Sequence, residues 1–407
     1  MRILIHDYAG HAFPVQLSRE LARRGHAVTH AYAGGLLTPR GALQRREGDP
    51  VGFSVVEVPM SPDYRTNKYS FLKRRGYELA YGVELAALVR RFRPEIILSG
   101  NTPTEPQMKF IKAAQASGIP FFSWVQDFYS LAVAKLAGRK IPVLGALVGM
   151  WYCHLDKQCL QGSAGVIAIT QDFQKILVEF GVPETRVSVI PNWAPLDELP
   201  MMGRPTAWAL DYGLADKFVF LYSGTLAMKH NPDLLLELAL KFRDDPAVRV
   251  VVISEGPGAD YLSIRRAADK LTNLVLLPFQ PFDELPAVLA SADVLLAVLE
   301  REASVFSVPS KVLTYHTVGR PILGAMPREN LAARIITEQG SGLCVEPENT
   351  LDFVTGAVQL RNDAGLRSEM GKRARGYAER AFQVSAIADR FEGLFVRAVH
   401  IDPSGKG

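Results

Sequence analysis

The sequence predicts an α/β protein made of two Rossmann-like, doubly wound domains that face a central cleft. Its 407 residues exceed the usual size of a single domain. Apolar, strand-like runs alternate with helical segments, and this alternation stops at a proline-rich link near residues 195–215 before it restarts. Hydrophobic residues make up 48% and charged residues 22% of the chain, which is typical of a globular protein with an ample core.

The first half begins with a βαβ unit. Residues 2–8 form an apolar run typical of a buried strand, residues 12–25 place apolar side chains at helical spacing, and residues 26–33 form a second strand. Parallel strands joined by helices build a doubly wound sheet. Further helices are expected at 81–94, 106–118 and 171–181, and further strands at 95–101, 119–127 and 166–170.

The second half repeats this organisation. Strands are expected at 218–224, 248–256, 274–279, 293–299 and 320–326, and helices at 231–244, 258–270, 282–292 and 310–319. We place the first domain at 1–200 and the second at 201–380. The remaining segment, 381–407, holds a last helix that could belong to either domain, followed by a loose tail.

Composition argues against several classes of protein. The net charge of +4 is too small to indicate nucleic-acid binding. Three cysteines, Cys153, Cys159 and Cys344, are too few for a disulfide scaffold, and we expect reduced, buried thiols rather than zinc ligands. The opening run 2–8 is typical of a core strand and not of a signal peptide, so we expect a cytoplasmic protein that is not exported.

Basic residues are concentrated in the first half. Residues 1–200 hold 23 Lys and Arg against 17 Asp and Glu, whereas the rest of the chain holds 23 against 25. Residues 65–75 carry five cations and no acid, and residues 141–153 are apolar but too few to span a bilayer. These stretches could be a solvated loop and a buried helix. Our hypothesis is that together they attach the protein to an anionic membrane surface.

Two loops of the second half are suited to an anionic ligand. Gly224 and Thr225 follow a predicted strand, with Lys229 shortly after them. Glu255 and Gly256 end the next predicted strand. Glycine at such points lets the backbone approach a ligand closely, because it has no Cβ.

A predicted helix start supplies the third part of this site. The helix begins at Ser310 and Lys311 and is closed by Gly319 and Pro321. Its first turn offers unpaired N–H groups and the positive end of the helix dipole, and both favour an anion. Together with the charges of Lys229 and Lys311, these groups could neutralise a diphosphate without a metal ion.

The loop after the first strand contains Gly10 and His11. It lacks the Gly-x-Gly-x-x-Gly pattern, and no acidic residue closes the second strand to hold a ribose. A nicotinamide cofactor is therefore not expected. Gly10 and His11 could lie in the cleft, or His11 could simply end the loop.

Five stretches of the chain match, in order, the motifs of a known family. They are residues 189–200, 222–239, 254–262, 278–294 and 307–323. The chain resembles glycosyltransferase family 4, in particular its bacterial members in capsule, O-antigen and colanic-acid-type polysaccharide synthesis. The resemblance implies a GT-B fold, a nucleotide-diphosphate sugar as donor, retention of anomeric configuration and no divalent metal in catalysis.

The resemblance also implies roles for donor-side residues. Lys229 matches the family's lysine that contacts the diphosphate, and the loop with Glu255 and Gly256 matches the loop near the nucleotide. Phe279 and Gln280 lie in the stretch that matches the loop whose backbone reads the base.

One departure from the family pattern concerns its two glutamates, which are usually seven residues apart. Phe306 and Thr314 stand in their places here, with Ser307 next to the first. Thr314 can still bond a ribose hydroxyl, though more weakly than a carboxylate, whereas Phe306 cannot replace a glutamate. Glu300 and Glu302 lie just upstream and could compensate, or they could face solvent.

On the acceptor side, the strand at 119–127 matches the place where many family members have a His-Asp pair. Gln126 takes the place of the histidine, and Asp127 remains. Asp127 could orient the acceptor hydroxyl or cap the following helix.

We therefore expect a retaining, metal-independent hexosyltransferase without a cofactor. It would move a sugar from a nucleotide-diphosphate donor, a UDP-sugar, to a lipid-linked saccharide at the inner face of the cell membrane. The expected catalytic residues are Lys229, Lys311 and Asp127. The expected donor-binding residues are Gly10, Gly224, Thr225, Glu255, Gly256, Phe279, Gln280, Phe306, Ser307, Ser310 and Thr314, and His11 and Gln126 are expected on the acceptor side.

Two alternatives remain open. A nucleotide-sugar epimerase or hydrolase of the same fold would need a carboxylate or histidine aimed at the sugar, and no such pair is evident from the sequence. A non-catalytic nucleotide-sugar-binding subunit would account for the loss of both family glutamates.

Overall fold

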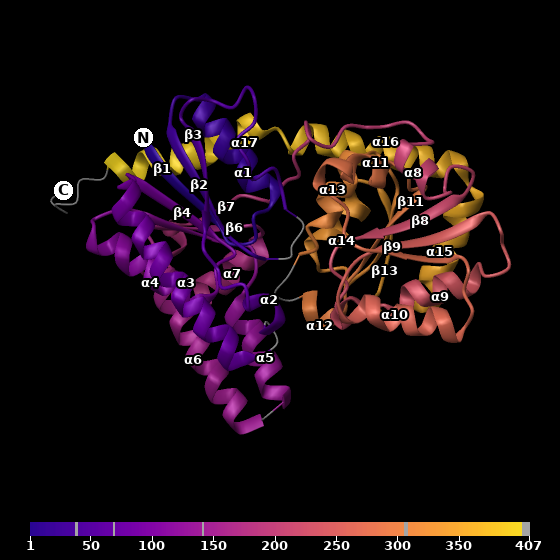
Figure 1. Cartoon of the computed structure of the whole chain (residues 1–407), viewed down its shortest axis with the longest axis horizontal. Coiled ribbons are helices and arrows are strands. Elements are labelled where there is room, and N and C mark those ends of the chain that lie inside the picture. The colour runs from indigo at the N-terminus through magenta and orange to yellow at the C-terminus, as the bar shows by residue number, and fades with distance from the viewer. Residues whose placement is uncertain (37–39, 68–69, 141, 305–307, 401–407) are drawn as a thin grey trace. The chain divides into compact units, whose positions relative to one another are not determined.

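The computed structural model describes residues 1–36, 40–67, 70–140, 142–304 and 308–400. The chain divides into two compact units, one formed by Met1–Pro191 with Val384–Gly407 and the other by Asn192–Gln383 (Figure 1). Each unit holds one sheet of parallel strands with helices packed on it. The predicted fold class, a pair of Rossmann-like doubly wound α/β domains, is confirmed.

The sheet of the first unit has seven parallel strands in the order β3-β2-β1-β4-β5-β6-β7. Its strands are β1 (Arg2–Asp7), β2 (Ala27–Ala33), β3 (Phe53–Val58), β4 (Ile96–Gly100), β5 (Phe121–Val125), β6 (Gly165–Ala168) and β7 (Val187–Val189). The sequence predicted the five inner strands and missed the two edge strands. β3 is only partly buried and β7 has three residues, so neither forms a continuous apolar run.

The helices of the first unit follow the expected alternation, with additions. They are α1 (Ala12–Arg23), α2 (Tyr64–Asn67), α3 (Phe71–Phe92), α4 (Thr104–Ala116), α5 (Tyr129–Lys140), α6 (Pro142–Gln161), α7 (Gln171–Glu179) and α17 (Val384–His400), with the short 3-10 helix η1 (Glu184–Arg186). α3 begins ten residues before the predicted helix at 81–94. α5 and α6 form a hairpin that projects from the unit (Figure 1).

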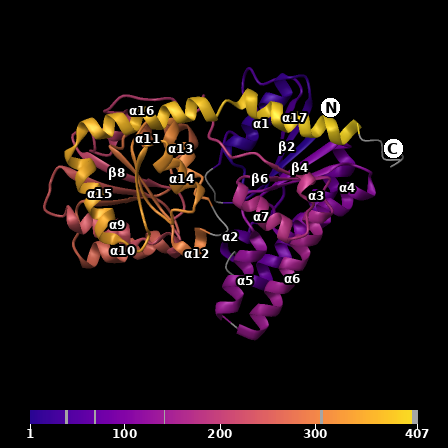
Figure 2. The same cartoon turned by 180° about the vertical axis from the view of Figure 1, so that it is seen from behind.

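The last helix, α17, packs on the first unit, where it lies along α1 (Figure 2). Its apolar face buries Phe391 and Phe395 completely, against the rings of Trp124 and Phe122 in β5. Arg24, just after α1, donates hydrogen bonds to carboxylates of α17. The sequence left the placement of this helix open because its apolar face could have covered either sheet.

The sheet of the second unit has six parallel strands in the order β10-β9-β8-β11-β12-β13. They are β8 (Phe218–Ser223), β9 (Val248–Ile253), β10 (Leu274–Leu277), β11 (Val294–Val298), β12 (Ile322–Ala325) and β13 (Gly342–Val345). Alternate residues of β8 enter different cores: Phe220 joins the core on one face, and Val219 and Leu221 join the core on the other. Both faces are covered, and the strands are therefore nearly continuous apolar runs.

The helices of the second unit surround this sheet. They are α8 (Ala207–Asp211), α9 (Asp233–Lys241), α10 (Pro257–Ala268), α11 (Leu285–Ala290), α12 (Arg301–Ser304), α13 (Lys311–Thr317), α14 (Leu331–Glu338), α15 (Thr350–Asn362) and α16 (Ala364–Ala381), with the 3-10 helices η2 (Met228–His230) and η3 (Phe282–Glu284). Among the described residues of both units, no helix is long and apolar enough to cross a membrane.

Candidate functional site

Open parallel sheets bind ligands where the strand order reverses, because the loops after the two strands at that point lead away from each other. The order reverses between β1 and β4 in the first unit, and between β8 and β11 in the second. Gly10 and His11 follow β1, and Gly224 follows β8. Lys311 opens α13, which lies in the connection from β11 to β12. Four residues predicted from the sequence thus lie at the two reversal points.

In the second unit, Lys311 lies directly against Gly224. The Lys311 Nζ is 3.5 Å from the centre of the Tyr222 ring, over its face. A Cβ on Gly224 would lie 3.2 Å from the same Nζ, and the φ of Gly224 is 129°. A side chain at position 224 would therefore crowd the ammonium group and strain the backbone. Glycine at position 224 therefore leaves room for the Lys311 ammonium group beside the backbone that follows β8.

A buried tyrosine fixes α13 to the end of β8. The Tyr315 hydroxyl accepts a hydrogen bond from the Ser223 N–H at 3.0 Å and donates one to the Ser223 carbonyl at 3.2 Å. Burial raises the pKa of both Tyr315 and Tyr222, so their hydroxyls stay protonated. The predicted helix is confirmed, since α13 covers Lys311–Thr317 and Gly319 follows with a φ of 64°.

The second glycine loop leads from β9 into α10. Gly256 precedes the helix with a φ of 113°, and Pro257 occupies the first turn. The Gly258 N–H donates to the Leu226 carbonyl at 2.9 Å, and a Cβ on Gly258 would lie 2.6 Å from that oxygen. The start of α10 is therefore packed against the loop that follows β8. Glu255 lies beside it with an exposed side chain.

The other residues predicted on the donor side differ in exposure and in their contacts. Thr225 is exposed, and its carbonyl accepts a hydrogen bond from the Tyr222 hydroxyl at 2.8 Å. Lys229 lies in η2, but its side chain is not among those described. Phe306 and Ser307 lie outside the described residues.

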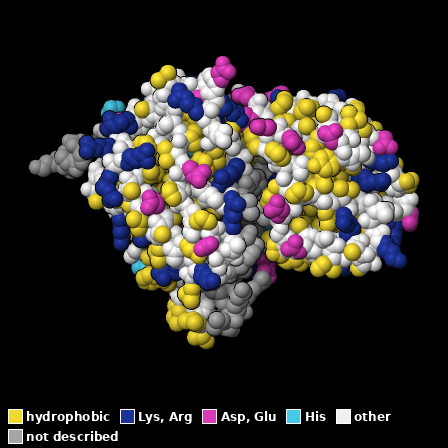
Figure 3. All heavy atoms as spheres, in the orientation of Figure 1, with side chains coloured by type: hydrophobic (Ala, Val, Ile, Leu, Met, Phe, Trp, Pro, Cys, Tyr) yellow, Lys and Arg dark blue, Asp and Glu magenta, His cyan; other side chains and the backbone are white. Residues whose placement is uncertain are grey.

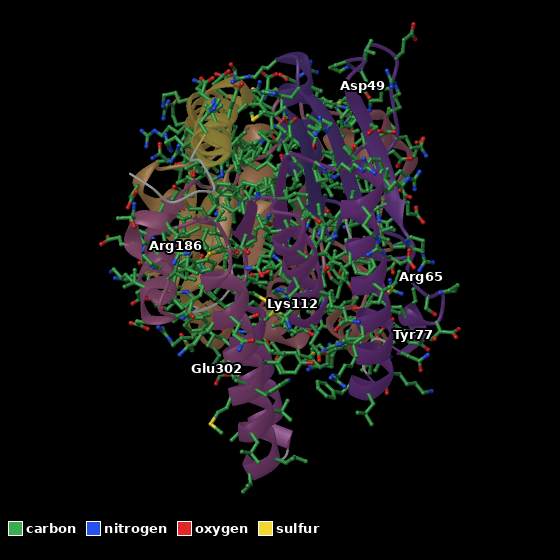
Figure 4. The ribbon with its side chains drawn as sticks, turned by 90° about the vertical axis from the view of Figure 1, so that its left-hand side faces the viewer. Asp49, Arg65, Tyr77, Lys112, Arg186 and Glu302 are labelled. Atoms are coloured by element: carbon green, nitrogen blue, oxygen red, sulfur yellow. The ribbon has the colours of Figure 1, made fainter. Side chains whose placement is uncertain are left out.

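The start of α13 bears on two further predictions. Ser310 is exposed and makes no capping hydrogen bond with its side chain. Thr314 is half-buried one turn later, and its carbonyl accepts a bond from the Thr317 hydroxyl at 2.7 Å. Glu300 is half-buried and Glu302, labelled in Figure 4, is exposed.

Gln280 is engaged within its own unit, which the sequence did not indicate. Its Oε1 accepts hydrogen bonds from the Trp208 Nε1 at 3.1 Å and from the Tyr212 hydroxyl at 3.4 Å. Its Nε2 donates to the Pro278 carbonyl at 2.9 Å. The side chain thus fixes the loop against α8, and Phe279 beside it is half-buried. α8 is too short for its aromatic pair to have been recognised from sequence periodicity.

In the first unit, His11 pairs with a buried carboxylate that the sequence analysis did not identify. The Asp7 side chain is 1% exposed, and its Oδ2 accepts a hydrogen bond from the His11 backbone N–H and lies 3.4 Å from His11 Nδ1. Burial alone lowers the pKa of His11, but the charges of Asp7 and Asp127 outweigh it and raise that pKa. The pKa of Asp7 is lowered, because His11 outweighs the effect of burial.

Asn101, just after β4, connects this pair to the end of β5. It has a φ of 55°, and its Nδ2 donates to Gln126 Oε1 at 2.8 Å and lies 3.3 Å from His11 Nδ1. Gln126 is buried, whereas Asp127 next to it is exposed. The predicted residues His11, Gln126 and Asp127 therefore do gather, around Asp7 and Asn101. The available signal for both missed residues was a polar residue at the carboxyl end of a buried strand, since Asp7 ends β1 and Asn101 follows β4.

A buried polar layer supports this cluster. His6 Nε2 lies 2.7 Å from the Tyr81 hydroxyl, and its Nδ1 lies 3.0 Å from Ser99 Oγ. Burial lowers the pKa of His6 to about 3, so the ring is neutral at physiological pH. Gly10 has a φ of 75°, and a Cβ added to it would lie 2.6 Å from the Cδ1 of Leu43. Of the two histidines, His6 has a lowered pKa and His11 a raised one, so His11 is the one that more readily carries a positive charge.

The described residues contain no group of three or more His, Cys, Asp or Glu side chains suited to holding a metal ion. The three cysteines form no disulfide, and Cys159 is buried in the first unit. Burial raises the pKa of the Cys159 thiol.

Two family models match the chain in tandem. Residues 11–193 match the glycosyl transferase 4-like domain, and residues 211–377 match the glycosyl transferases group 1 domain. The chain belongs to glycosyltransferase family 4. The resemblance inferred from the motifs is confirmed, and so is the GT-B fold that it implied.

This family 4 glycosyltransferase is similar in sequence to WcaI and in fold to HepE and WaaG. It is 28% identical, over 74% of each chain, to the colanic acid biosynthesis glycosyl transferase WcaI of Escherichia coli K12. It shares its fold with HepE of Anabaena, solved with UDP and glucose, at a TM-score of 0.71 and 13% identity over 98% of this chain and 100% of HepE. WaaG, a glycosyltransferase involved in lipopolysaccharide biosynthesis, matches at a TM-score of 0.67 and 13% identity, over 97% and 99% of the two chains.

Proposed function

We propose that this glycosyltransferase moves a sugar from a UDP-sugar to a hydroxyl of a lipid-linked saccharide, with retention of anomeric configuration, in the synthesis of a cell-surface polysaccharide. The observation that carries the proposal is the Lys311 ammonium, held over Tyr222 and against the backbone of Gly224. Further support comes from the similarity to WcaI and from HepE, which was solved with UDP.

Stabilising the leaving diphosphate is the main catalytic task in this mechanism. The bond from the sugar C1 to the phosphate oxygen breaks, and a bond from C1 to the acceptor oxygen forms on the same face of the ring. The acceptor proton passes to the departing phosphate. Lys229, Lys311 and the N–H groups at the starts of α10 and α13 neutralise the developing charge, which requires no metal ion.

The polar cluster of the first unit is the proposed acceptor site. Asp127 is exposed and ionisable, so it can accept a hydrogen bond from an acceptor hydroxyl. The Asp7 carboxylate holds His11 in one orientation, and Asn101 does the same for Gln126. Amide, imidazole and carboxylate groups in one cluster can bond the several hydroxyls of a saccharide.

The enzyme is proposed to work at the inner face of the cell membrane as a peripheral protein. A lipid-linked saccharide presents its hydroxyls at the bilayer surface, so a transferase that uses it must reach that surface. The cationic surplus of residues 1–200 favours an anionic surface.

A hydrolase or epimerase of the same fold is the second candidate, favoured by one specific observation. The Asp7 and His11 pair is a carboxylate–histidine pair of the kind that such a reaction requires. A hydrolase would release UDP and free sugar without an acceptor, and an epimerase would convert the donor sugar without releasing UDP. The remaining candidate, a non-catalytic binding subunit, would bind the donor and turn nothing over.

One experiment separates these functions. A panel of nucleotide sugars is first screened for thermal stabilisation, since a ligand at a hundred times its Kd adds about 2.7 kcal/mol. The stabilising donor is then incubated with and without membrane lipid extract, and UDP release and the anomeric configuration of the product are measured. Acceptor-dependent UDP release with retention supports the proposal, whereas acceptor-independent release or inversion contradicts it.

A further inference from the structure

The projecting part of α6 carries five large apolar side chains that are exposed. Five such side chains of α6 recur at the spacing i, i+1, i+4, i+7 and i+8, which places them on one face of the helix. They are Val143, Leu144, Leu147, Met150 and Trp151, and each is more than half exposed, from 54% for Trp151 to 80% for Val143. We call them the outer stripe. Hydrophobic side chains are visible at the projecting end of the first unit in Figure 3.

Small residues of α6 lie on the opposite side of the helix, toward α5. Gly145 and Gly149, one turn apart on α6, are buried. A Cβ on Gly149 would lie 2.7 Å from the Cβ of Ala134 in α5, so the two backbones approach closely. A hairpin surrounded by water would gain most by placing its large apolar side chains between the helices. Small residues inside and large apolar residues outside are typical of helices that are surrounded by hydrocarbon.

The outer stripe ends where α6 meets the body of the unit. From Tyr152 onward the helix has the usual distribution, with Tyr152, Cys159 and Leu160 buried. Figure 4 shows the end of the hairpin extending past Tyr77 of α3, with side chains that point away from the other elements. The unusual pattern is therefore confined to the part of the hairpin that projects.

Charge around the outer stripe favours an anionic surface. Residues 128–155 contain no Asp or Glu, but they contain Lys135, Arg139 and Lys140. Residues 64–77 contain no acid either, and this segment contacts the hairpin. The Phe71 ring packs edge-on against the Tyr152 ring with their centres 6.2 Å apart. An anionic partner can therefore approach both segments without repulsion from carboxylates in either.

The basic segment 65–75 by itself is a weaker anchor than its sequence suggested. Arg75 donates three hydrogen bonds of 2.7 to 3.0 Å to the Glu105 carboxylate. Arg74 lies 3.4 Å from the Glu78 carboxylate and donates to the Tyr129 hydroxyl. Two of the five cations of this segment are thus paired with carboxylates of the same unit. Binding to a membrane therefore depends mainly on the apolar side chains of the outer stripe.

We propose that the outer stripe is a membrane-docking surface, which inserts into the interface of an anionic bilayer with α6 lying in it rather than crossing it. The docking surface rests on the proposed function in one respect only, namely that the membrane face concerned is the inner one. A second copy of the chain fits less well, because a symmetric contact would bring the same cationic segments face to face. A stable dimer also buries about 800 Å² per partner, more than a single row of five side chains supplies.

Trp151 provides a direct optical test. The other tryptophans, Trp124, Trp193 and Trp208, are at most 5% exposed. Full-length protein is mixed with vesicles of phosphatidylcholine and phosphatidylglycerol, without donor or acceptor. Tryptophan emission should move to shorter wavelength, and lipids brominated on their acyl chains should quench it. The Trp151→Phe variant should still bind the vesicles but lose most of the shift.

Flotation with the same vesicles tests the remaining residues. Changing Leu144, Leu147 and Met150 together to Ser should lower the partition coefficient about tenfold or more, because the apolar area inserted is reduced. Wild type should stay bound in about 0.5 M salt, since insertion is not screened as charge attraction is. The matched control changes Ile264 and Leu351, which are 70% and 76% exposed in the second unit, to Ser and should bind like wild type.

Several results would overturn the proposal. The proposal is wrong if the wild-type protein fails to float with anionic vesicles at low salt. It is also wrong if the triple variant binds the vesicles as well as the wild type does. A wild-type dimer that the triple variant converts to monomers, without vesicle binding, would assign the outer stripe to a second copy instead. The vesicle experiment contains no sugar, so a failure to bind vesicles does not contradict the proposed transfer reaction. A protein that binds vesicles but has no transfer activity would contradict the reaction and not the docking surface.

Discussion

The Lys311 ammonium group lies over an aromatic ring and beside a glycine. The face of the Tyr222 ring attracts the ammonium group, and Gly224 leaves room beside it. The hydroxyl of Tyr315 fixes the helix that carries the lysine. The cation is thus pre-positioned, and little side-chain conformational freedom remains to be lost when an anion binds.

Replacing Lys311 with Ala should therefore lower kcat about a hundredfold, because a contact with a leaving phosphate contributes on the order of 3 kcal/mol in the transition state. The far-ultraviolet circular dichroism should be unchanged. Lys372→Ala is the matched control, since Lys372 is 70% exposed and pairs with Glu369 one turn away on the same helix. Near-normal turnover in the Lys311 variant would remove this residue from the mechanism.

A second residue-level prediction concerns the pH dependence of the Asp7 and His11 pair. The folded-state pKa of His11 is raised, so its contribution to stability is complete below the unfolded pKa and is lost as pH rises through the folded value. The folded-state pKa of Asp7 is lowered, so its contribution is present above about pH 4 and is lost in stronger acid. The pKa values of His6 and His30 are lowered to about 3 and about 4, so both rings are neutral at pH 5.5 and above.

Asp7→Asn should accordingly lower the Tm more at pH 5.5 than at pH 9, because less of His11 is charged at the higher pH. Proton NMR titration of His11 should show its pKa falling in the variant. His26→Gln, which removes a histidine that contacts Glu392 of α17, provides a comparison for the loss of a histidine elsewhere in the unit. An equal loss of Tm at both pH values would contradict the coupling between Asp7 and His11.

At the level of elements, the start of α10 depends on a glycine. Gly258 packs against the Leu226 carbonyl, so the loop after β8 and the first turn of α10 are in direct contact. This contact joins two of the segments proposed to surround the diphosphate. In contrast, Gly76 lies in α3, and a Cβ added to it would have nothing within 4 Å.

The two glycines should respond in opposite directions to the same change. Gly258→Ala places a Cβ 2.6 Å from a carbonyl oxygen and should destabilise the protein by about 1 to 3 kcal/mol. Gly76→Ala should stabilise it by about 0.5 to 1 kcal/mol, because alanine restricts the unfolded chain and has the higher helix propensity. Urea unfolding measures both, and a Gly258 variant as stable as wild type would show that this packing is not tight.

At the scale of the whole molecule, the chain passes between the two units twice. It leaves the first unit after Pro191 and returns to it at Val384. The first unit is therefore completed only when the last helix has been made, and Phe391 and Phe395 then cover β5. A chain truncated before residue 384 would leave these aromatic contacts of β5 unmade.

For the whole enzyme, transfer activity should survive chelation of divalent metals. Lysine ammonium groups and helix N–H groups can carry the charge stabilisation, and they are unaffected by EDTA. The assay compares initial rates of UDP release with and without EDTA, with a metal-dependent glycosyltransferase as the positive control for chelation. Loss of activity that magnesium or manganese restores would overturn the metal-free mechanism.

The sequence by itself determined the fold class, the inner strands and several loop positions. Buried parallel strands are continuous apolar runs, and helices have their own spacing, so β1 and α1 could be recognised from local pattern alone. The backbone requirements of Gly224, Gly256 and Gly319 are also local, since each has a positive φ after a strand or helix. Family motifs along the chain then indicated the GT-B fold and the reaction class.

Only the tertiary structure decided which distant residues meet. Asp7 and Asn101 come together because β1 and β4 are neighbours in the sheet although they are 94 positions apart in the chain. The same holds for Tyr222 and Lys311, and for α17 on the first unit. Residues 141–153 could have been a buried or an exposed helix, since their apolar pattern fits both. The packing of Gly149 on Ala134 shows which face of α6 is inside the hairpin. Sequence periodicity indicates that a helix has an apolar face, but not what covers that face.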